Sequence, residues 1–143
     1  MTVTIDDLAA KLTAQSKDYF EFMRLVRVTE ADVDAYEERA GATLPQPYRE
    51  AMCQLGVGEL PFGELYGPDP EGEYDGLAAA QELGIEGFLP LAPNGCGDYY
   101  GLIRDGDAFR PTVHFADHEE SYAVKDTGSD IVSFLARHGF NLG

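Results

Sequence analysis

The order of periodic segments along the chain is the feature that most restricts its fold. Apolar side chains recur at helical spacing within residues 5–55, whereas residues 88–124 hold short apolar or alternating runs between glycine-rich turns. Helices that precede strands, without alternating βαβ units, predict an α+β domain with helices packed against an antiparallel sheet. The 143 residues suit a single domain, and we find neither a linker nor an internal repeat.

Three helices are predicted in the N-terminal region from their start and stop signals. Thr4 and Thr29 each precede a helical pattern and have an aspartate three residues further on, close to a capping box. Gly41 is placed to end the second helix in a left-handed conformation. Pro47 fits the first turn of the third helix, and the glycines at 56 and 58 are expected to stop it.

The segments that follow are less regular. Residues 19–26 fit either an extension of the first helix or a first strand, and residues 62–66 fit a short strand. The acidic, Pro/Gly-rich residues 67–76 predict an exposed loop, followed by a short helix over 77–83 that Gly84 closes.

The C-terminal region predicts strands and one last helix. A proline in the first strand indicates an edge or the strand's start. An Asp-Gly pair signals a hairpin, and Asp130 is a candidate helix cap. The expected strands are residues 88–92, 99–103, 112–115 and 121–124, with the hairpin at 104–107.

The chain is strongly acidic. Its 26 Asp and Glu face 10 Lys and Arg, for a formal net charge of -16. Such a chain repels phosphate backbones and anionic membranes, so we expect no nucleic acid or membrane as a direct partner. A protein with a basic surface is favoured instead, although the charge can also serve solubility alone.

The cysteines and the N-terminus point to the cytoplasm. Cys53 and Cys96 are far apart, which fits neither a disulfide framework nor a zinc site, and we expect reduced thiols. The first residues lack the pattern of a signal peptide, and no apolar run is long enough to span a bilayer.

Four stretches, in this order, carry a resemblance to a known family. They are residues 29–41, 44–50, 89–100 and 113–120, the last followed by a helix with Phe134-Leu135. Together they resemble the SMI1/KNR4 (SUKH) family over residues 28–138. The residues in these motifs that we expect to serve the fold are Leu44, Pro45, Tyr48, Gly95, Gly97, Asp98, Asp117 and His118.

The resemblance implies a compact α+β fold with helices packed on an antiparallel sheet. It also implies protein binding without an established catalytic activity. Many bacterial members look like immunity proteins that neutralise a cognate toxin, and other members belong to eukaryotic regulators. The resemblance implies no cofactor.

Two polar motifs contain residue types that could carry chemistry. Cys96 beside a histidine would make a nucleophile, but the neighbouring Asp98 suppresses the thiolate, which favours a tight glycine turn with Asp98 accepting backbone N–H groups. Residues 117–120 could offer metal ligands together with Asp98 if their strands pair. We expect instead a polar turn in which His118 is hydrogen-bonded to Asp98 or Asp117, with no metal.

The expected partner contacts combine aromatic rings with carboxylates. Tyrosine is favoured at interfaces, although strand tyrosines equally fit a core, and the acidic loop could simply be solvated. Alternation predicts that one of Tyr99 and Tyr100 is buried and the other exposed. The candidates are Tyr66, Asp69, Glu71, Glu73, Tyr74, Asp75, Tyr100, Glu119 and Glu120.

Three functions remain open from the sequence. The first is an immunity protein that binds a toxin domain and occludes it. The second is a regulatory or scaffold module with an endogenous partner and no toxin. The third is a hydrolase or metal-dependent enzyme that uses Cys96, Asp98 or His118.

Overall fold

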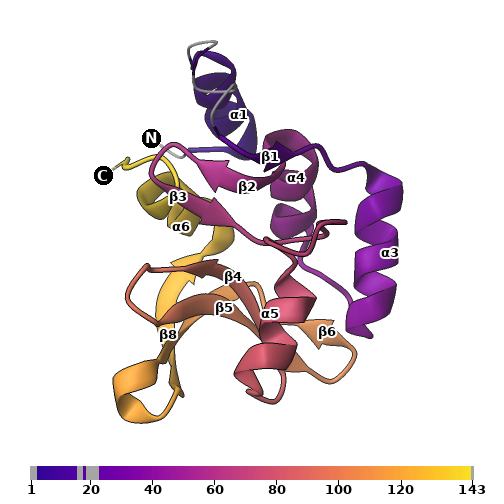
Figure 1. Cartoon of the computed structure of the whole chain (residues 1–143), viewed down its shortest axis with the longest axis vertical. Coiled ribbons are helices and arrows are strands. Elements are labelled where there is room, and N and C mark those ends of the chain that lie inside the picture. The colour runs from indigo at the N-terminus through magenta and orange to yellow at the C-terminus, as the bar shows by residue number, and fades with distance from the viewer. Residues whose placement is uncertain (1–2, 16–17, 19–22, 143) are drawn as a thin grey trace.

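The computed structural model describes residues 3–15, 18 and 23–142. Its helices are α1 (Ile5–Thr13), α3 (Glu30–Ala40), α4 (Gln46–Leu55), α5 (Gly76–Leu83) and α6 (Ile131–His138), with a 3-10 turn at His118–Glu120. Its strands are β1 (Leu25–Val26), β2 (Val57–Leu60), β3 (Gly63–Leu65), β4 (Phe88–Pro93), β5 (Tyr99–Asp105), β6 (Ala108–Phe109), β7 (Thr112–Asp117) and β8 (Ala123–Asp130). Figure 1 shows their arrangement.

The strands form two antiparallel sheets. One has the order β1-β2-β3, and the other has the order β4-β5-β7-β8 with β6 paired to β5. The Tyr66 N–H donates to the Leu91 carbonyl at 2.7 Å, which links the chain just after β3 to β4. The predicted α+β class is confirmed, and the strands occupy two sheets.

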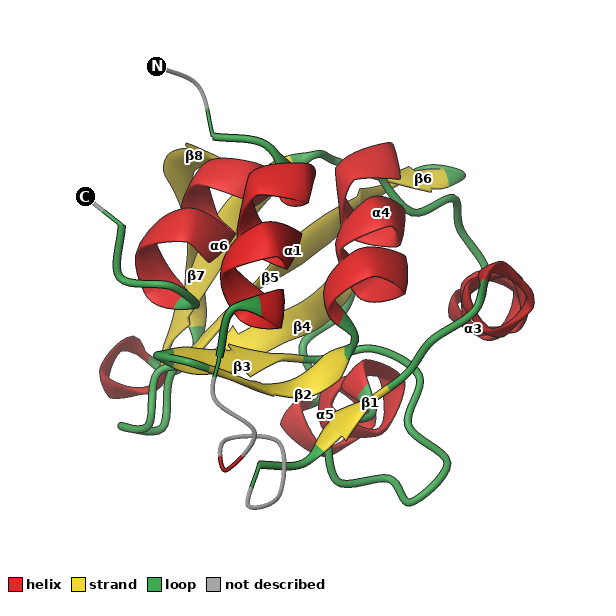
Figure 2. Cartoon of the chain, turned by 90° about the horizontal axis from the view of Figure 1, so that it is seen from above, coloured by secondary structure: helices red, strands yellow, loops and turns green. Residues whose placement is uncertain are grey.

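Helices α6, α1 and α4 lie side by side over the strands (Figure 2). Helix α4 packs against both α1 and α6, and α6 rests on β7 and β8. Fully buried side chains such as Leu8, Tyr36, Tyr48 and Met52 join these elements in one core. No helix in the described part of the chain is long and apolar enough to cross a membrane.

The predicted helix boundaries are confirmed at their caps. Thr4 and Thr29 each form a complete capping box with the aspartate three residues on. Gly41 (φ 73°) and Gly84 (φ 68°) end α3 and α5 in the left-handed region. Asp130 caps α6 through the Ser133 N–H at 2.8 Å.

Two predicted features of the strands are confirmed, and one predicted strand boundary is corrected. Pro90 lies in β4, which is the end strand of its sheet, and Gly106 and Asp107 make the expected two-residue hairpin between β5 and β6. The strand predicted over 121–124 begins only at 123, because the two residues before it have φ near 60° and complete a tight turn.

Residues 57–60 are the strand that the sequence missed. We expected Gly58 to help stop the third helix, whereas it lies inside β2, opposite Leu25 on one side and Leu65 on the other. Residues 25 and 26 form β1, so that end of the ambiguous segment 19–26 is a strand; residues 19–22 lie outside the described part of the chain.

Gly58 permits the close pairing of β1 with β2. Its φ is 132°, and an added Cβ would collide with the carbonyl oxygen of Arg24. Only glycine adopts this backbone conformation without strain. Gly58→Ala is therefore expected to lower the free energy of unfolding by about 1–3 kcal/mol from the backbone conformation, plus the cost of the collision.

Urea unfolding of Gly58→Ala and Gly72→Ala measures the two contributions. Gly72 also has a positive φ, 84°, but no atom lies within 4 Å of its added Cβ. The difference between the two variants reports the collision with Arg24. Equal destabilisation would contradict the close approach.

Candidate protein-binding surface

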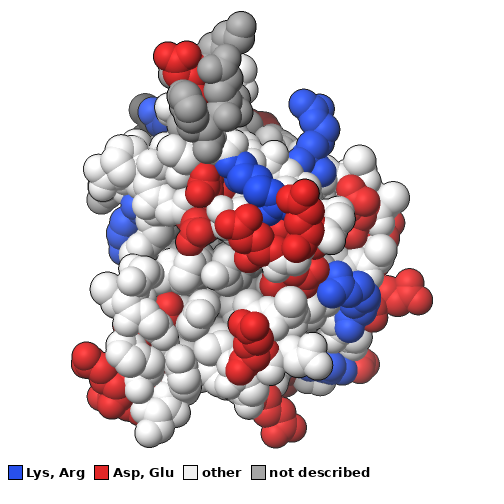
Figure 3. Space-filling view, viewed as in Figure 1, with Lys and Arg blue, Asp and Glu red and all other residues white. Residues whose placement is uncertain are grey.

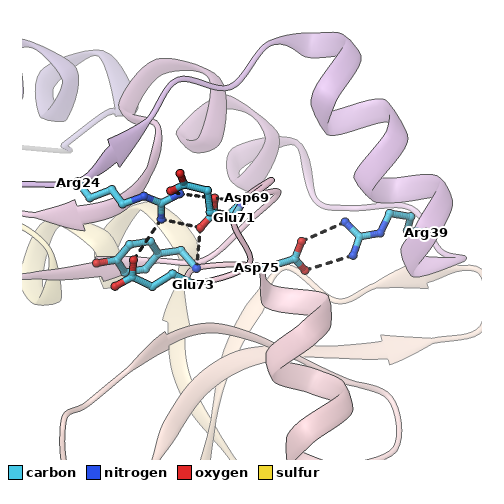
Figure 4. A network of polar contacts seen from close by, with 7 residues as sticks. Arg24, Arg39, Asp69, Glu71, Glu73 and Asp75 are labelled. Carbon is cyan, nitrogen blue, oxygen red and sulfur yellow. Dashed lines mark hydrogen bonds and ion pairs between the residues drawn. The ribbon is translucent and has the colours of Figure 1, made fainter.

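An ion-pair network around Arg24 organises the acidic segment 67–76 (Figure 4). The guanidinium of Arg24 binds both oxygens of Asp69, at 2.5 and 2.7 Å, and also contacts Glu71 at 2.7 Å. Its third carboxylate partner, Glu73, is 3.5 Å away, and the cation lies 5.4 Å from the ring centroid of Tyr74. Bidentate pairing of this kind fixes geometry as well as charge.

Asp69 is the buried centre of this network. Its side chain is fully covered, and it also accepts the backbone N–H groups of Glu71 and Tyr74 at 3.0 and 2.9 Å. The hydrogen bond from Arg24, opposed by burial and helped by the two N–H groups, lowers the pKa of Asp69 to about 2. The carboxylate therefore stays charged at neutral pH.

The prediction of an exposed loop over 67–76 is wrong for much of the segment. Asp69, Tyr74 and Asp75 are all buried, because the Arg24 network and the start of α5 hold them against the core. Asp75 caps α5 through two N–H groups, both at 3.0 Å, and pairs with Arg39 at 3.1 Å. These three candidates for partner contact are therefore buried residues that hold the segment against the core.

Glu71 and Glu73 are the exposed members of the same segment. Their side chains are 75% and 62% exposed. Because buried Asp69 fixes the backbone between them, these two carboxylates are presented to solvent on an ordered support. They are the sequence candidates that the structure places most openly at this surface.

Carboxylates crowd around this network on one face of the molecule (Figure 3). We define the acidic patch as Glu59, Glu64, Asp69, Glu71 and Glu73. Arg24 contacts each of these residues except Glu64, which lies next to Glu59. Glu59 and Glu64 are directly opposite each other on β2 and β3. Burial, and then the charges of Glu59 and Glu73, raise the pKa of Glu64.

Like charges directly opposite on paired strands are destabilising. Glu59 accepts the Arg24 backbone N–H at 3.1 Å. No ion pair to Glu64 is present among the described residues. The patch thus keeps negative charge that its own cation only partly offsets.

A second polar cluster joins the 94–98 turn to the end of β7. Asp98 accepts the backbone N–H of His118 at 2.8 Å and lies 2.5 Å from its Nδ1. It also accepts from the Asn94 amide at 2.7 Å. These hydrogen bonds lower the pKa of Asp98 to about 2, and the bond from the His118 backbone N–H has the largest effect. The side-chain hydrogen bond that His118 donates to Asp98 raises the pKa of His118.

The expected glycine turn and the expected Asp98–His118 hydrogen bond are confirmed. Gly95 and Gly97 have φ of 82° and 96°. Asn94, which the sequence analysis passed over, caps the turn by accepting the N–H groups of Cys96 and Asp98. The Cys96 thiol is exposed and, within the described part of the chain, makes no hydrogen bond to a histidine.

The same cluster contains a possible set of metal ligands. Strands β5 and β7 pair as supposed, and one ligand atom from each of Asp98, Asp117 and His118 lies within 4.8 Å of the others. The oxygens of Asp98 already accept three hydrogen bonds, and Asp117 caps the 3-10 turn. These hydrogen bonds already give the three side chains a structural role in the turn.

Tyr100 is held among aromatic rings. It lies 5.0 Å from Phe115, 4.9 Å from Phe134 and 4.7 Å from His138, measured between centroids. Both Tyr99 and Tyr100 are half-buried, so the expected contrast between them is wrong. Glu119 and Glu120 are exposed at the far turn, where Glu120 pairs with Lys125 at 2.6 Å.

The Leu44-Pro45-Tyr48 motif connects helices to the acidic segment. Leu44 is buried, and its N–H donates to Glu37 at 2.8 Å, while Pro45 precedes α4 as its cap residue. Tyr48 is fully buried and donates its O–H to the Tyr66 carbonyl at 2.5 Å. This motif thus fixes the chain at Tyr66, just before the acidic segment 67–76.

The structure adds residues that the sequence analysis did not select. Arg24 is separated from Asp69 by 45 residues, so no local motif joins them. Exposed Phe62 lies between two short strands, one of which the sequence analysis did not predict. A strand prediction over 57–60 would have placed Glu59 opposite Glu64 and drawn attention to their charges.

The comparison with known families agrees with these features. The model of the SMI1/KNR4 family (SUKH-1) matches residues 27–137. Because the match covers most of the chain, the protein belongs to this family. No curated protein and no solved structure gave a match.

Asp69→Ala tests whether the buried carboxylate holds the segment. The change leaves two backbone N–H groups and the Arg24 guanidinium without this acceptor, so the free energy of unfolding should fall by about 2–4 kcal/mol. Urea unfolding gives the value. Glu71→Ala is the matched control, since it removes an exposed partner of the same arginine and should cost less than about 1 kcal/mol.

The Asp98–His118 pair should make stability depend on pH. Because the pKa of Asp98 is lowered in the folded protein, its carboxylate contributes stability above its ordinary pKa of 3.8. This contribution is lost as the pH falls towards 2. Because the pKa of His118 is raised in the folded protein, its protonated imidazole contributes stability below pH 6.5. This contribution is lost as the pH rises through the folded-state pKa. His118→Gln should therefore destabilise the protein more at about pH 5 than at about pH 9.

Unfolding curves at both pH values and an NMR titration of His118 provide the measurement. In Asp98→Asn, the pKa of His118 should fall towards 6.5, because the Asp98 carboxylate is the main cause of its raised value. The same loss of stability at both pH values would show that the charged pair contributes nothing.

Proposed function

We propose that this protein binds a partner protein that has a basic surface, and that the partner is a toxin domain which it neutralises in the cytoplasm as an immunity protein. Membership of the SMI1/KNR4 family supports the protein-binding part of the proposal. The observation that carries it is the acidic patch, in which exposed carboxylates project from a segment fixed by a buried ion pair.

The fixed backbone favours tight binding. Association costs free energy wherever loops must be ordered at the interface, and a preorganised segment reduces this cost. Here Asp69 and Asp75 fix both ends of the segment before any partner arrives. Glu71 and Glu73 can then meet cationic side chains with little further ordering.

The charge favours fast encounter with a basic partner. A negative patch steers a positive surface towards it and rejects partners of like charge. A toxin that acts on nucleic acid has a basic cleft for phosphates, and the acidic patch would occupy that cleft with carboxylates. Neutralisation would then follow from occlusion, with no reaction on the inhibitor.

Co-expression tests this function directly. The protein is produced together with the toxin encoded beside its gene, and growth and complex formation by pull-down are measured. We expect rescued growth and a stable complex. Growth no better than with the toxin alone, together with no complex, would remove the immunity proposal.

Charge reversal of the patch should weaken the complex. Glu71→Lys/Glu73→Lys should raise Kd by roughly tenfold or more, because both exposed carboxylates would then repel the basic partner. Glu50→Lys/Glu86→Lys changes the net charge by the same amount at exposed positions outside the patch and is the control. Calorimetry or surface plasmon resonance gives Kd.

The same binding assay has a second readout. The association rate should fall as ionic strength rises from about 0.1 M to about 1 M, where the screening length shrinks from about 10 Å to about 3 Å. An unchanged rate, or equal weakening by the two double variants, would remove the electrostatic part of the proposal.

A further inference from the structure

The β2–β3 hairpin has one face against the end of α6. The N–H of Phe62, at the turn of the hairpin, donates to the Gly139 carbonyl at 2.9 Å. An added Cβ at Gly63 would be only 2.5 Å from the His138 carbonyl oxygen, so this residue faces α6. Figure 1 and Figure 2 show that α1, α4 and α6 all lie on that side of the two strands. The opposite face of the hairpin is therefore its outer face.

Glu64 and Tyr66 point to this outer face. Side chains along a strand alternate between its two faces, and both Gly63 and the fully buried Leu65 face inwards. Glu59 is directly opposite Glu64 on β2 and so shares its face. Glu64 and Tyr66 are both half-buried. The outer face of the hairpin thus combines a pair of carboxylates with a tyrosine.

Tyr99 and Glu82 extend this outer face onto β5 and α5. The ring of Tyr100 packs against α6, so its strand neighbour Tyr99 points to the side away from that helix. Burial raises the pKa of the Tyr66 hydroxyl, and three acidic groups raise it further. They belong to Glu64, Tyr99 and Glu82, which therefore lie near this hydroxyl. We call these four residues the Tyr66 face.

The Tyr66 face carries negative charge that the chain itself does not offset. Neither Glu64 nor Glu82 has an ion pair among the described residues. Figure 3 shows that carboxylates also occur below the Arg24 network on the same side of the molecule. A cationic group that entered this face would meet a complementary potential. The charge therefore favours a basic occupant and disfavours a second copy of this acidic chain.

Arg24 shows how neighbouring residues of this surface bind a guanidinium. Its cation lies 5.4 Å from the ring centroid of Tyr74 and pairs with Glu71 and Glu73 at 2.7 and 3.5 Å. The Tyr66 face offers the same two components, a tyrosine and carboxylates, and no cation–π contact to it is present among the described residues. Arginine suits such a surface because its planar guanidinium stacks on aromatic rings and pairs with a carboxylate through two N–H groups.

We propose that the interface continues from the acidic patch onto the Tyr66 face, where an arginine of the partner protein binds between Glu64 and Glu82 against the tyrosines. This deepens the proposed function and rests on it, since it names one contact of the basic partner. Tyrosine is favoured at the centres of interfaces, where its large ring excludes water from the charged contact. Lysine, a compact and strongly hydrated charge, would use this surface less well.

The first experiment measures binding to the toxin encoded beside the gene. Glu82→Lys should raise Kd by roughly tenfold, because this exposed residue would then repel the arginine. Tyr99→Ala should raise Kd by roughly fivefold through lost contact area. Glu50→Lys is the matched control, since it reverses the charge of an exposed glutamate on α4, on the other side of the strands. Its Kd should change by less than about twofold.

The outcomes separate this interface from the proposed function. An unchanged Kd for Glu82→Lys and Tyr99→Ala, in a complex that forms normally, would overturn the Tyr66 face and leave the proposed function standing. Equal weakening by Glu82→Lys and Glu50→Lys would also overturn it, because net charge alone would then explain the effect. No complex with the unaltered protein would remove the proposed function, and the second experiment then decides on the face by itself.

The second experiment uses the protein alone with N-acetyl-arginine amide as the probe. We expect saturable NMR shifts at Glu64, Tyr66 and Tyr99, with a Kd on the order of 10 mM for so few contacts. The pKa of Glu64, raised in the free protein, should fall towards its ordinary value of 4.5, because a bound guanidinium favours the carboxylate. Glu82→Gln should weaken binding by roughly twofold or more, and its amide spectrum shows that it is folded.

Sodium chloride and N-acetyl-lysine amide, each at the same ionic strength, are the controls for this titration. Shifts that do not saturate, or that centre outside the Tyr66 face, would overturn the assignment. The same holds if the pKa of Glu64 changes no more with the arginine probe than with sodium chloride. Equal binding of the lysine probe would overturn the selection of arginine.

Discussion

The pairing of Arg24 with buried Asp69 is the interaction on which the order of the acidic face depends. One carboxylate, wholly covered, joins the chain just before β1 to a segment that lies 45 residues later. It also satisfies two backbone N–H groups of that segment. Without the guanidinium, a charge would be buried without its partner, which is among the costlier defects in a folded protein. The acidic segment is therefore ordered by charge as well as by apolar packing.

The distribution of negative charge follows from this arrangement. Some carboxylates of the patch are used for structure, such as Asp69, and others face solvent, such as Glu71 and Glu73. The opposed pair Glu59 and Glu64 lowers stability where it stands. Natural proteins often accept such local costs at functional surfaces. Under the proposed function, binding and stability make different demands on the patch.

The sequence predicts the local features of this fold well and its long-range features poorly. Capping boxes at Thr4 and Thr29, and the glycines that end α3 and α5, are decided by neighbours a few residues away. The hidden strand β2 is short and contains Gly58, so neither alternation nor propensity reveals it. Composition alone made residues 67–76 look exposed, because nothing local shows that a distant arginine would bury Asp69.

The turn at Phe62 has a consequence for how such a protein can change. Its backbone is held through main-chain groups, namely the N–H of Phe62 and the close approach of Gly63 to α6. The exposed side chain takes little part in that attachment. A different residue at position 62 would thus leave the scaffold intact while altering what the surface fits. Partner choice could then drift by single substitutions, with the architecture underneath left unchanged.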